Sequence, residues 1–262
     1  MHPRIIPALS LKFPPLAIFY AQEPPSDAKE MRSLCSMLLV AQAAMGRTMA
    51  ITRGTCRCPG AGKGLGLEPS NHGTIPGGGE CYLHFFPTRK QDLEHGHTMI
   101  QKLTVGGASQ TMTDDRSGRE YLYKTLEGMV QRPGHLPRLQ PEAPYVVLKP
   151  LEALVPDEKP KVVSLLIEPD QLPALVSLSD RTRPGIDRVW LPFTAGCASM
   201  VLYPLHDAER TNPRAIIGLT DTSTRFYLRK ALGKEVVAFT VPWGMFVEME
   251  ETISNGLIKH CA

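Results

Sequence analysis

Residues 161–178, KVVSLLIEPDQLPALVSL, combine a short apolar run with the beginning of a helical pattern. Val162–Ile167 is an almost continuous apolar run with a charged residue at each end. Such a short run is typical of a strand that is buried on both faces of a sheet. Asp170 stands where a helix N-cap is expected, and Gln171–Leu178 follows as a helix. The stretch therefore predicts a strand followed by a helix, which is the repeating unit of an α/β protein.

The alternation of strands and helices continues through the second half of the chain. The predicted strands cover residues 145–150, 188–193, 215–219 and 235–241. The predicted helices cover residues 198–205 and 243–254, and Pro242 fits the first turn of the second. Strands that alternate with helices favour an α/β fold, and we expect a mixed sheet flanked by helices.

The first half is less regular and rich in glycine. Short strands are predicted at 16–19 and 48–52, and a helix over 29–45, with Ser26 or Asp27 as its cap. Polar residues 86–117 predict a lid or an insertion. We expect a single domain over residues 1–262.

Composition excludes several classes of protein. The 262 residues are 42% hydrophobic and 21% charged, which is a globular balance. A net charge of +3 and 6% aromatic residues argue against a nucleic-acid partner. Apolar stretches fall short of the roughly 20 residues that a membrane span needs, and the N-terminus does not read as a signal peptide. We therefore expect a cytoplasmic protein with no membrane partner.

The strongest chemical signal is CRCPG at residues 56–60, where two cysteines enter a glycine-rich loop. Thiolates in such a loop suit a soft metal ion or an iron–sulfur cluster. Further ligands would come from distant turns and helix ends. The candidate metal ligands are Cys35, Cys56, Cys58, Cys81 and Cys197. The alternative is that these cysteines are buried structural thiols or reactive thiols.

A second candidate site would bind a small anion. The loop GAGKGLG at residues 60–66 lacks the spacing of a nucleotide-binding motif, but its backbone N–H groups and lysine could cradle an anion. Asp221 ends a predicted strand, where α/β proteins bind ligands, although it could equally cap a helix. The candidate binding residues are Gly60, Gly62, Lys63, Gly64, Glu80, Asp221 and Arg225.

Two weaker signals indicate a reactive thiol and a histidine metal site. Cys197 lies between a predicted strand and a helix, where the helix dipole favours a thiolate nucleophile, but no histidine is placed as its base. His95 and His97 would share one face of a strand and could bind a metal, or they are surface residues.

Six blocks of the sequence carry a family resemblance. They are PPLAIFY (14–20), LCSMLLVAQAAMGRTMAI (34–51), CRCPGAGKGLGL (56–67), LPFTAGCASMVLYPL (191–205), AIIGLTDTSTR (215–225) and FTVPWGMFVEMEE (239–251). With these blocks the chain resembles domain of unknown function 169, the uncharacterised ArCR family. The resemblance implies a prokaryotic soluble α/β protein, and it brings no established activity. The blocks include Cys35, Cys58 and Cys197.

Two functions follow as hypotheses. The first is a protein with a cysteine-ligated metal or iron–sulfur site, either redox-linked or an enzyme. The second is a non-catalytic binding or regulatory domain for a small anionic ligand. Both predict a small-molecule ligand, and both leave the reaction, if any, and the oligomeric state open.

Overall fold

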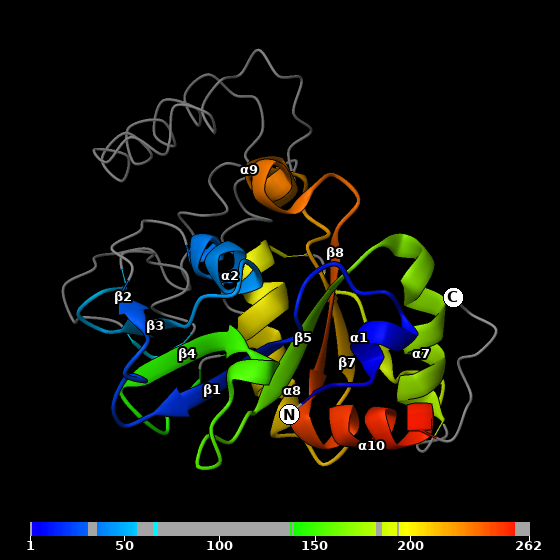
Figure 1. Cartoon of the computed structure of the whole chain (residues 1–262), viewed down its shortest axis with the longest axis horizontal. Helices are drawn as coiled ribbons and strands as arrows, with labels where there is room; N and C mark the ends of the chain where they lie inside the picture. Colours follow the sequence, from blue (N-terminus) through cyan, green and yellow to red (C-terminus); the bar gives the residue numbers. More distant parts are fainter. Residues whose placement is uncertain are drawn as a thin grey trace.

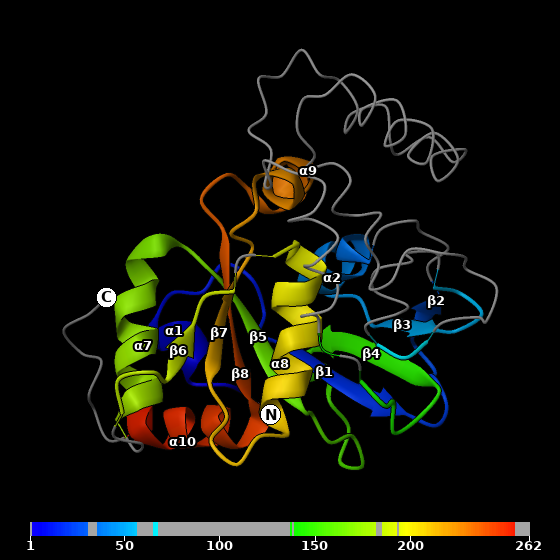
Figure 2. The ribbon, with the colours of Figure 1, turned by 180° about the vertical axis from the view of Figure 1, so that it is seen from behind.

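The computed structural model describes residues 2–30, 36–56, 65–67, 137, 139–181, 185–192 and 194–254. These residues form one eight-stranded sheet with helices on both faces (Figures 1 and 2). The predicted α/β class and the mixed sheet are therefore confirmed. The suggested lid around 86–117 lies outside the described residues.

The sheet has the strand order β2-β3-β4-β1-β5-β8-β7-β6. The strands are β1 (Leu16–Ala21), β2 (Lys29–Glu30), β3 (Met49–Thr52), β4 (Tyr145–Pro150), β5 (Val162–Ile167), β6 (Val189–Trp190), β7 (Ala215–Gly218) and β8 (Val237–Pro242). Only the outermost pairs, β2–β3 and β6–β7, are parallel among these strands, and the inner neighbours are antiparallel. The strand sequences predict burial, but they carry little information on direction.

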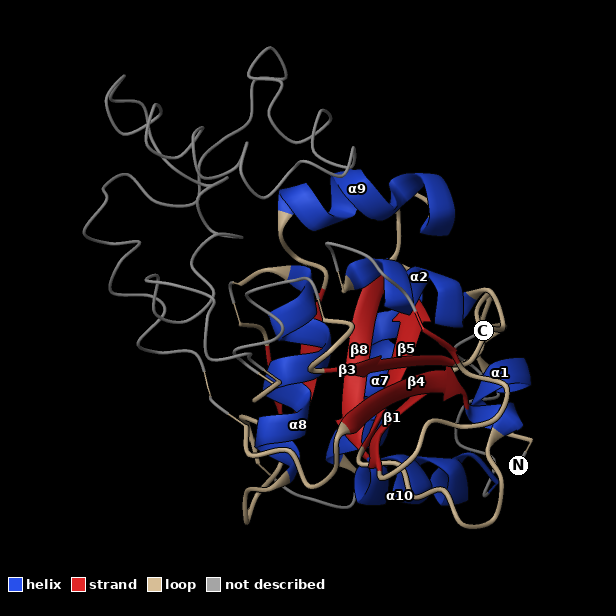
Figure 3. Ribbon diagram, turned by 90° about the vertical axis from the view of Figure 1, so that its left-hand side faces the viewer, coloured by secondary structure: helices blue, strands red, loops and turns tan. Residues whose placement is uncertain are grey.

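Helices cover the sheet in two layers. The helices are α1 (Ile5–Ala8), α2 (Met37–Ala44), α7 (Leu172–Asp180), α8 (Tyr203–Ala208), α9 (Thr222–Leu232) and α10 (Trp243–Ser254). We call one side the α2 face, where α2 and α8 pack on the sheet and α9 lies beside α2 (Figure 3). The other side is the α10 face, which α1, α7 and α10 cover. Among the described helices, none combines the length and apolar character that a bilayer span requires.

Strand β5 shows why the sheet is buried on both sides. Val162 and Leu166 point into the core of the α2 face, whereas Val163 and Leu165 point into that of the α10 face. Side chains of a strand alternate between faces, so a nearly continuous apolar run is needed when both faces are covered. The prediction for this strand is confirmed.

The predicted helix over 29–45 is wrong in its first part. Lys29–Glu30 is strand β2, and α2 begins at Met37. The backbone N of Lys29 donates to the Thr48 carbonyl at 2.9 Å, and Asp27 accepts from the Thr48 hydroxyl instead of capping a helix. Pairing with β3 thus overrides local helix propensity in this segment.

Three further boundaries differ from the prediction. Asp170 is not the cap of α7, because a 3₁₀ turn (η4, Pro169–Gln171) comes first and Glu168 forms a capping box with Gln171. Pro242 ends β8 rather than opening α10. The predicted strand over 188–193 is limited to Val189–Trp190 within the described residues.

Glu250 of α10 anchors the N-terminal segment. Its buried carboxylate accepts hydrogen bonds from the backbone N of Arg4 at 2.7 Å and of Ile5 at 2.9 Å. We expect Glu250→Ala to lower the free energy of unfolding by about 2 kcal/mol, because two N–H groups lose a charged acceptor. Urea denaturation followed by circular dichroism measures the change. The neighbouring exposed Glu251→Ala is the control, and an equal loss in both variants would contradict this account.

Candidate functional site

Three segments meet at the carboxyl end of β7. They are the turn that carries Cys197, the residues directly after β7, and the first turn of α9. Cys197 immediately precedes η5 (Ala198–Leu202), a π-helical turn that runs into α8. π-Helical turns are rare and occur frequently at functional sites. This junction is therefore the part of the described fold that stands out as a candidate site.

Hydroxyl groups tie the three segments together. The Thr224 hydroxyl accepts from the backbone N of Gly196 at 3.2 Å. The buried Ser199 hydroxyl donates to the Gly196 carbonyl at 3.2 Å and accepts from the backbone N of Leu219 at 3.3 Å. The residue before Cys197 is thus held through both its N–H and its C=O group.

The packing at this junction leaves little space beside two glycines. A Cβ atom at Gly196 would lie 2.6 Å from Cγ2 of Thr224, and one at Gly218 would lie 3.1 Å from Oγ of Ser199. Real Cβ atoms are not found as close as the first of these distances. A side chain at position 196 would therefore require Thr224 to move, and one at position 218 would require Ser199 to shift by a few tenths of an ångström.

We expect Gly196→Ala to destabilise the protein by about 2 kcal/mol, because the new methyl group overpacks the contact with Thr224. Thermal or urea denaturation measures this loss. Gly54→Ala is the matched control, since a Cβ atom there meets nothing within 4 Å. Equal stability of the two variants would show that the contact is not tight in solution.

The backbone is strained where β7 ends. Leu219 has a φ of 58°, in the left-handed region that non-glycine residues seldom occupy. Such a conformation costs about 1 kcal/mol or more and tends to cluster at functional sites. The hydrogen bond from its backbone N to Ser199 helps to stabilise it.

Asp221 and Arg225 both stabilise α9. Asp221 is the buried N-cap, whose Oδ2 accepts from the backbone N of Thr224 at 2.8 Å, so the helix-cap alternative is confirmed. The Arg225 guanidinium donates to the Leu219 carbonyl at 3.4 Å and to the Lys234 carbonyl at 2.6 Å. Their role in binding an anion stays a prediction.

Two of the candidate metal-binding cysteines lie within the described residues. Cys56 is buried in the hydrophobic core of the α2 face, and the half-buried Cys197 packs against the same core. No group of three or more His, Cys, Asp or Glu residues that could hold a metal occurs within the described ranges. The other candidates lie outside those ranges: Cys35, Cys58, Cys81, Gly60, Gly62, Lys63, Gly64, Glu80, His95 and His97.

Tyr20 is the titratable residue with a clear shift on the α2 face. Burial raises the pKa of its phenol above the ordinary value, and the carboxylates of Glu209 and Glu142 raise it further. Its hydroxyl is buried and has no hydrogen-bond partner among the described residues. A tyrosine phenol is protonated at neutral pH even at its ordinary pKa, and the upward shift extends the protonated form further into the alkaline range.

Ser199 and Thr224 were not predicted from the sequence as site residues. Ser199 is in the block GCAS (196–199) and Thr224 is in TDTST (220–224), close to the predicted residues Cys197 and Asp221. The signal that could have found Ser199 is its position three residues after a glycine at a strand–helix turn, where hydroxyls often bond to the local backbone. Thr224 is brought to Gly196 by tertiary packing, and no local pattern indicates that contact.

The fold and site define an α/β protein with a mixed, mostly antiparallel sheet and a cysteine at the turn into a helix on one face. The family model of domain of unknown function 169, described as uncharacterised ArCR, matches residues 4–252, and the chain belongs to this family. No curated protein and no solved structure matches it.

Proposed function

We propose that this protein holds a thiolate-ligated metal ion or iron–sulfur cluster on its α2 face. Cys35, Cys58 and Cys197 are the proposed ligands, with Cys56 or Cys81 as a fourth. The observation that carries the proposal is that Cys56 and Cys197, distant in sequence, share one hydrophobic core.

Chain connectivity supports the two proposed ligands that flank described segments. Cys35 is bonded to Ser36, the residue that precedes α2, and Cys58 is two residues beyond Cys56. Each of these two cysteines is therefore within two residues, in sequence, of a described segment that contributes to the core of the α2 face. The α2 residues from Met37 onward also belong to the core that includes Cys56.

The chemistry of the site follows from its ligands. Thiolates are soft ligands that favour zinc, copper(I) and iron–sulfur clusters. If Cys35, Cys58 and Cys197 alone bound the metal, one coordination position would stay open for a small-molecule substrate, as in catalytic zinc sites, whereas a fourth cysteine would close the site. With iron the same arrangement would serve electron transfer or redox chemistry.

The alternative is a binding domain for a small anion. It receives less support from the described residues, because the Arg225 guanidinium donates to backbone carbonyls and Asp221 caps a helix. Lys63 and its neighbouring glycines remain the residues on which that alternative depends.

Metal content of cysteine variants tests the proposal. Cys58→Ser and Cys197→Ser, purified without oxygen, should each lose most of the bound metal and any visible absorption. Cys261→Ser is the matched control, because this cysteine is outside the proposed ligand set, and it should keep both. Full metal content in Cys197→Ser, with a wild-type circular dichroism spectrum, would contradict the proposal.

A further inference from the structure

We propose that α9 is a hinged lid over the turn at residues 195–199, and that Arg225 is the latch that holds this lid closed. The lid consists of residues 219–234, which comprise α9 and its two connections to β7 and β8. The lid and its latch involve described residues alone, and they would work in the same way with or without a bound metal.

The position of α9 is that of an excursion from the sheet. Strands β7 and β8 are antiparallel neighbours, and the chain leaves the sheet after β7, forms α9 and returns as β8. Figures 1 and 2 show α9 beyond the ends of these two strands. Among the described elements α9 packs mainly on α2, and its buried Leu228 and Leu232 belong to the same core as α2. An element attached in this way can open while the sheet stays folded.

Both connections of α9 contain a residue with a positive φ. Leu219 in the first has a φ of 58°, and Gly233 in the second has a φ of 95° and a ψ of 172°. The conformation of Gly233 is essentially restricted to glycine. A Cβ atom there would meet no described atom within 4 Å, so the backbone conformation requires this glycine and the packing does not. These two residues are the positions at which a change of φ and ψ would move α9.

Arg225 joins the two connections to each other. Its Nη1 donates to the Leu219 carbonyl at 3.4 Å, and its Nη2 donates to the Lys234 carbonyl at 2.6 Å. One side chain of α9 therefore fixes the segments on both sides of that helix. Loss of its two hydrogen bonds would release both hinges at once, and we assign the latch to Arg225 for this reason.

The first turn of α9 covers Gly196. The Thr224 hydroxyl accepts from the backbone N of Gly196 at 3.2 Å, and Cγ2 of Thr224 lies 2.6 Å from the position that a Cβ atom would take there. Cys197 is half-buried and packs against the core that includes Leu228 and Leu232. Movement of α9 away from α2 would therefore expose the turn at residues 195–199 to solvent.

Two variants act on the latch and on a hinge. Arg225→Met keeps an unbranched stem and removes both donors, and we expect it to raise the opening equilibrium of α9 about tenfold. Lys230→Met is its matched control, because Lys230 is an exposed cation on the same helix. Gly233→Ala is the second variant, in case Arg225→Met does not fold, and its strained backbone should also favour opening about tenfold. Its control is Gly54→Ala, which meets no described atom within 4 Å and has no positive φ.

The experiment is hydrogen–deuterium exchange of the full chain, read by mass spectrometry at several urea concentrations below the unfolding transition. Peptides from α9 and from residues 195–199 report the lid, and peptides from β5 and α10 report global unfolding. Opening of the lid exposes little surface, so exchange of the lid peptides in wild type should be faster and nearly independent of urea. Exchange of the β5 and α10 peptides should be slower and should accelerate steeply with urea.

The variants complete the test. Arg225→Met and Gly233→Ala should each raise the exchange rate of the lid peptides about tenfold, still with little dependence on urea, whereas both controls should match wild type. The proposal would be overturned if the lid peptides of wild type exchanged at the same rate and with the same urea dependence as those of β5. Wild-type exchange of the lid peptides in both folded variants would overturn it equally.

Discussion

Asp207→Ala is expected to lower the free energy of unfolding by about 4 kcal/mol, because it leaves a largely buried arginine without its carboxylate. Asp207 of α8 is 1% exposed and accepts from Arg214 at three places: the backbone N at 2.6 Å, Nη2 at 2.7 Å and Nε at 3.2 Å. The guanidinium also lies 4.5 Å from the ring centre of Trp190 on the edge strand β6. This pair joins α8 to the edge of the sheet.

Urea denaturation measures that loss, and tryptophan fluorescence should report it because Trp190 is in contact with Arg214. Arg210→Ala is the control. Arg210 is half-exposed and lies 3.7 Å from the same carboxylate, so its removal should cost less than about 1 kcal/mol. A loss below about 1 kcal/mol in Asp207→Ala would show that this ion pair does not stabilise the fold.

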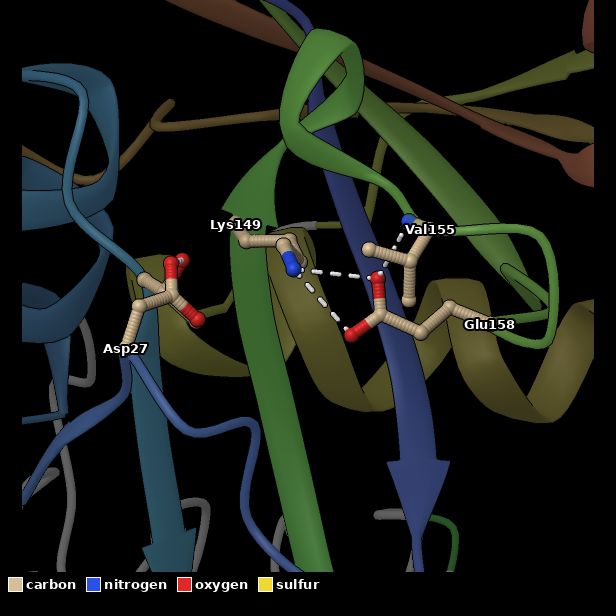
Figure 4. A network of polar contacts seen from close by, with 5 residues as sticks. Asp27, Lys149, Val155 and Glu158 are labelled. Atoms are coloured by element: carbon tan, nitrogen blue, oxygen red, sulfur yellow. Dashed lines mark hydrogen bonds and ion pairs between the residues drawn. The ribbon is translucent and has the colours of Figure 1, made fainter.

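Glu158→Ala is expected to cost about 3 kcal/mol, because it leaves Lys149 buried without its partner. Lys149 is on β4 with its side chain 3% exposed, and its ammonium donates to both Glu158 oxygens, at 3.0 and 3.1 Å. Glu158 also accepts from the backbone N of Val155 at 3.0 Å (Figure 4). The ion pair therefore fastens the loop after β4 onto the sheet.

Two controls separate burial from charge. The ion pair between Lys161 and Glu142 is more exposed, so Glu142→Ala should change stability by less than about 1 kcal/mol. The double variant Lys149→Met/Glu158→Ala should recover most of the loss, because it removes the unpaired buried charge. Chemical denaturation of wild type, Glu158→Ala, Glu142→Ala and the double variant measures their free energies of unfolding. If the double variant were as unstable as Glu158→Ala, the account would be contradicted.

Local sequence pattern predicts what depends on burial. Val162–Ile167 must be apolar on both faces because helices cover both, and the run shows that directly. Strands were also predicted over residues 145–150 and 215–219, and the structure has β4 at Tyr145–Pro150 and β7 at Ala215–Gly218. Helix α9 was predicted only through the alternative that Asp221 caps a helix, and Asp221 is indeed its N-cap.

A local sequence pattern does not predict contacts between residues that are far apart in the chain. Lys29–Glu30 pairs with β3, and β5 runs antiparallel to β8, and neither fact follows from propensity. At the site, Cys197 was selected from its place before a helix. Its supports, Thr224 and Ser199, depend on the strand order that brings β7 and α9 to that turn.

Metal binding by the cysteines of the α2 face can be measured on wild-type protein purified without oxygen. The measurement is visible absorption together with the content of iron, zinc and acid-labile sulfide per chain. The account predicts a stoichiometric metal, with sulfide and a brown colour if the group is an iron–sulfur cluster. Colourless protein that contains neither iron nor zinc, and that acquires neither when they are supplied to the reduced protein, would contradict it.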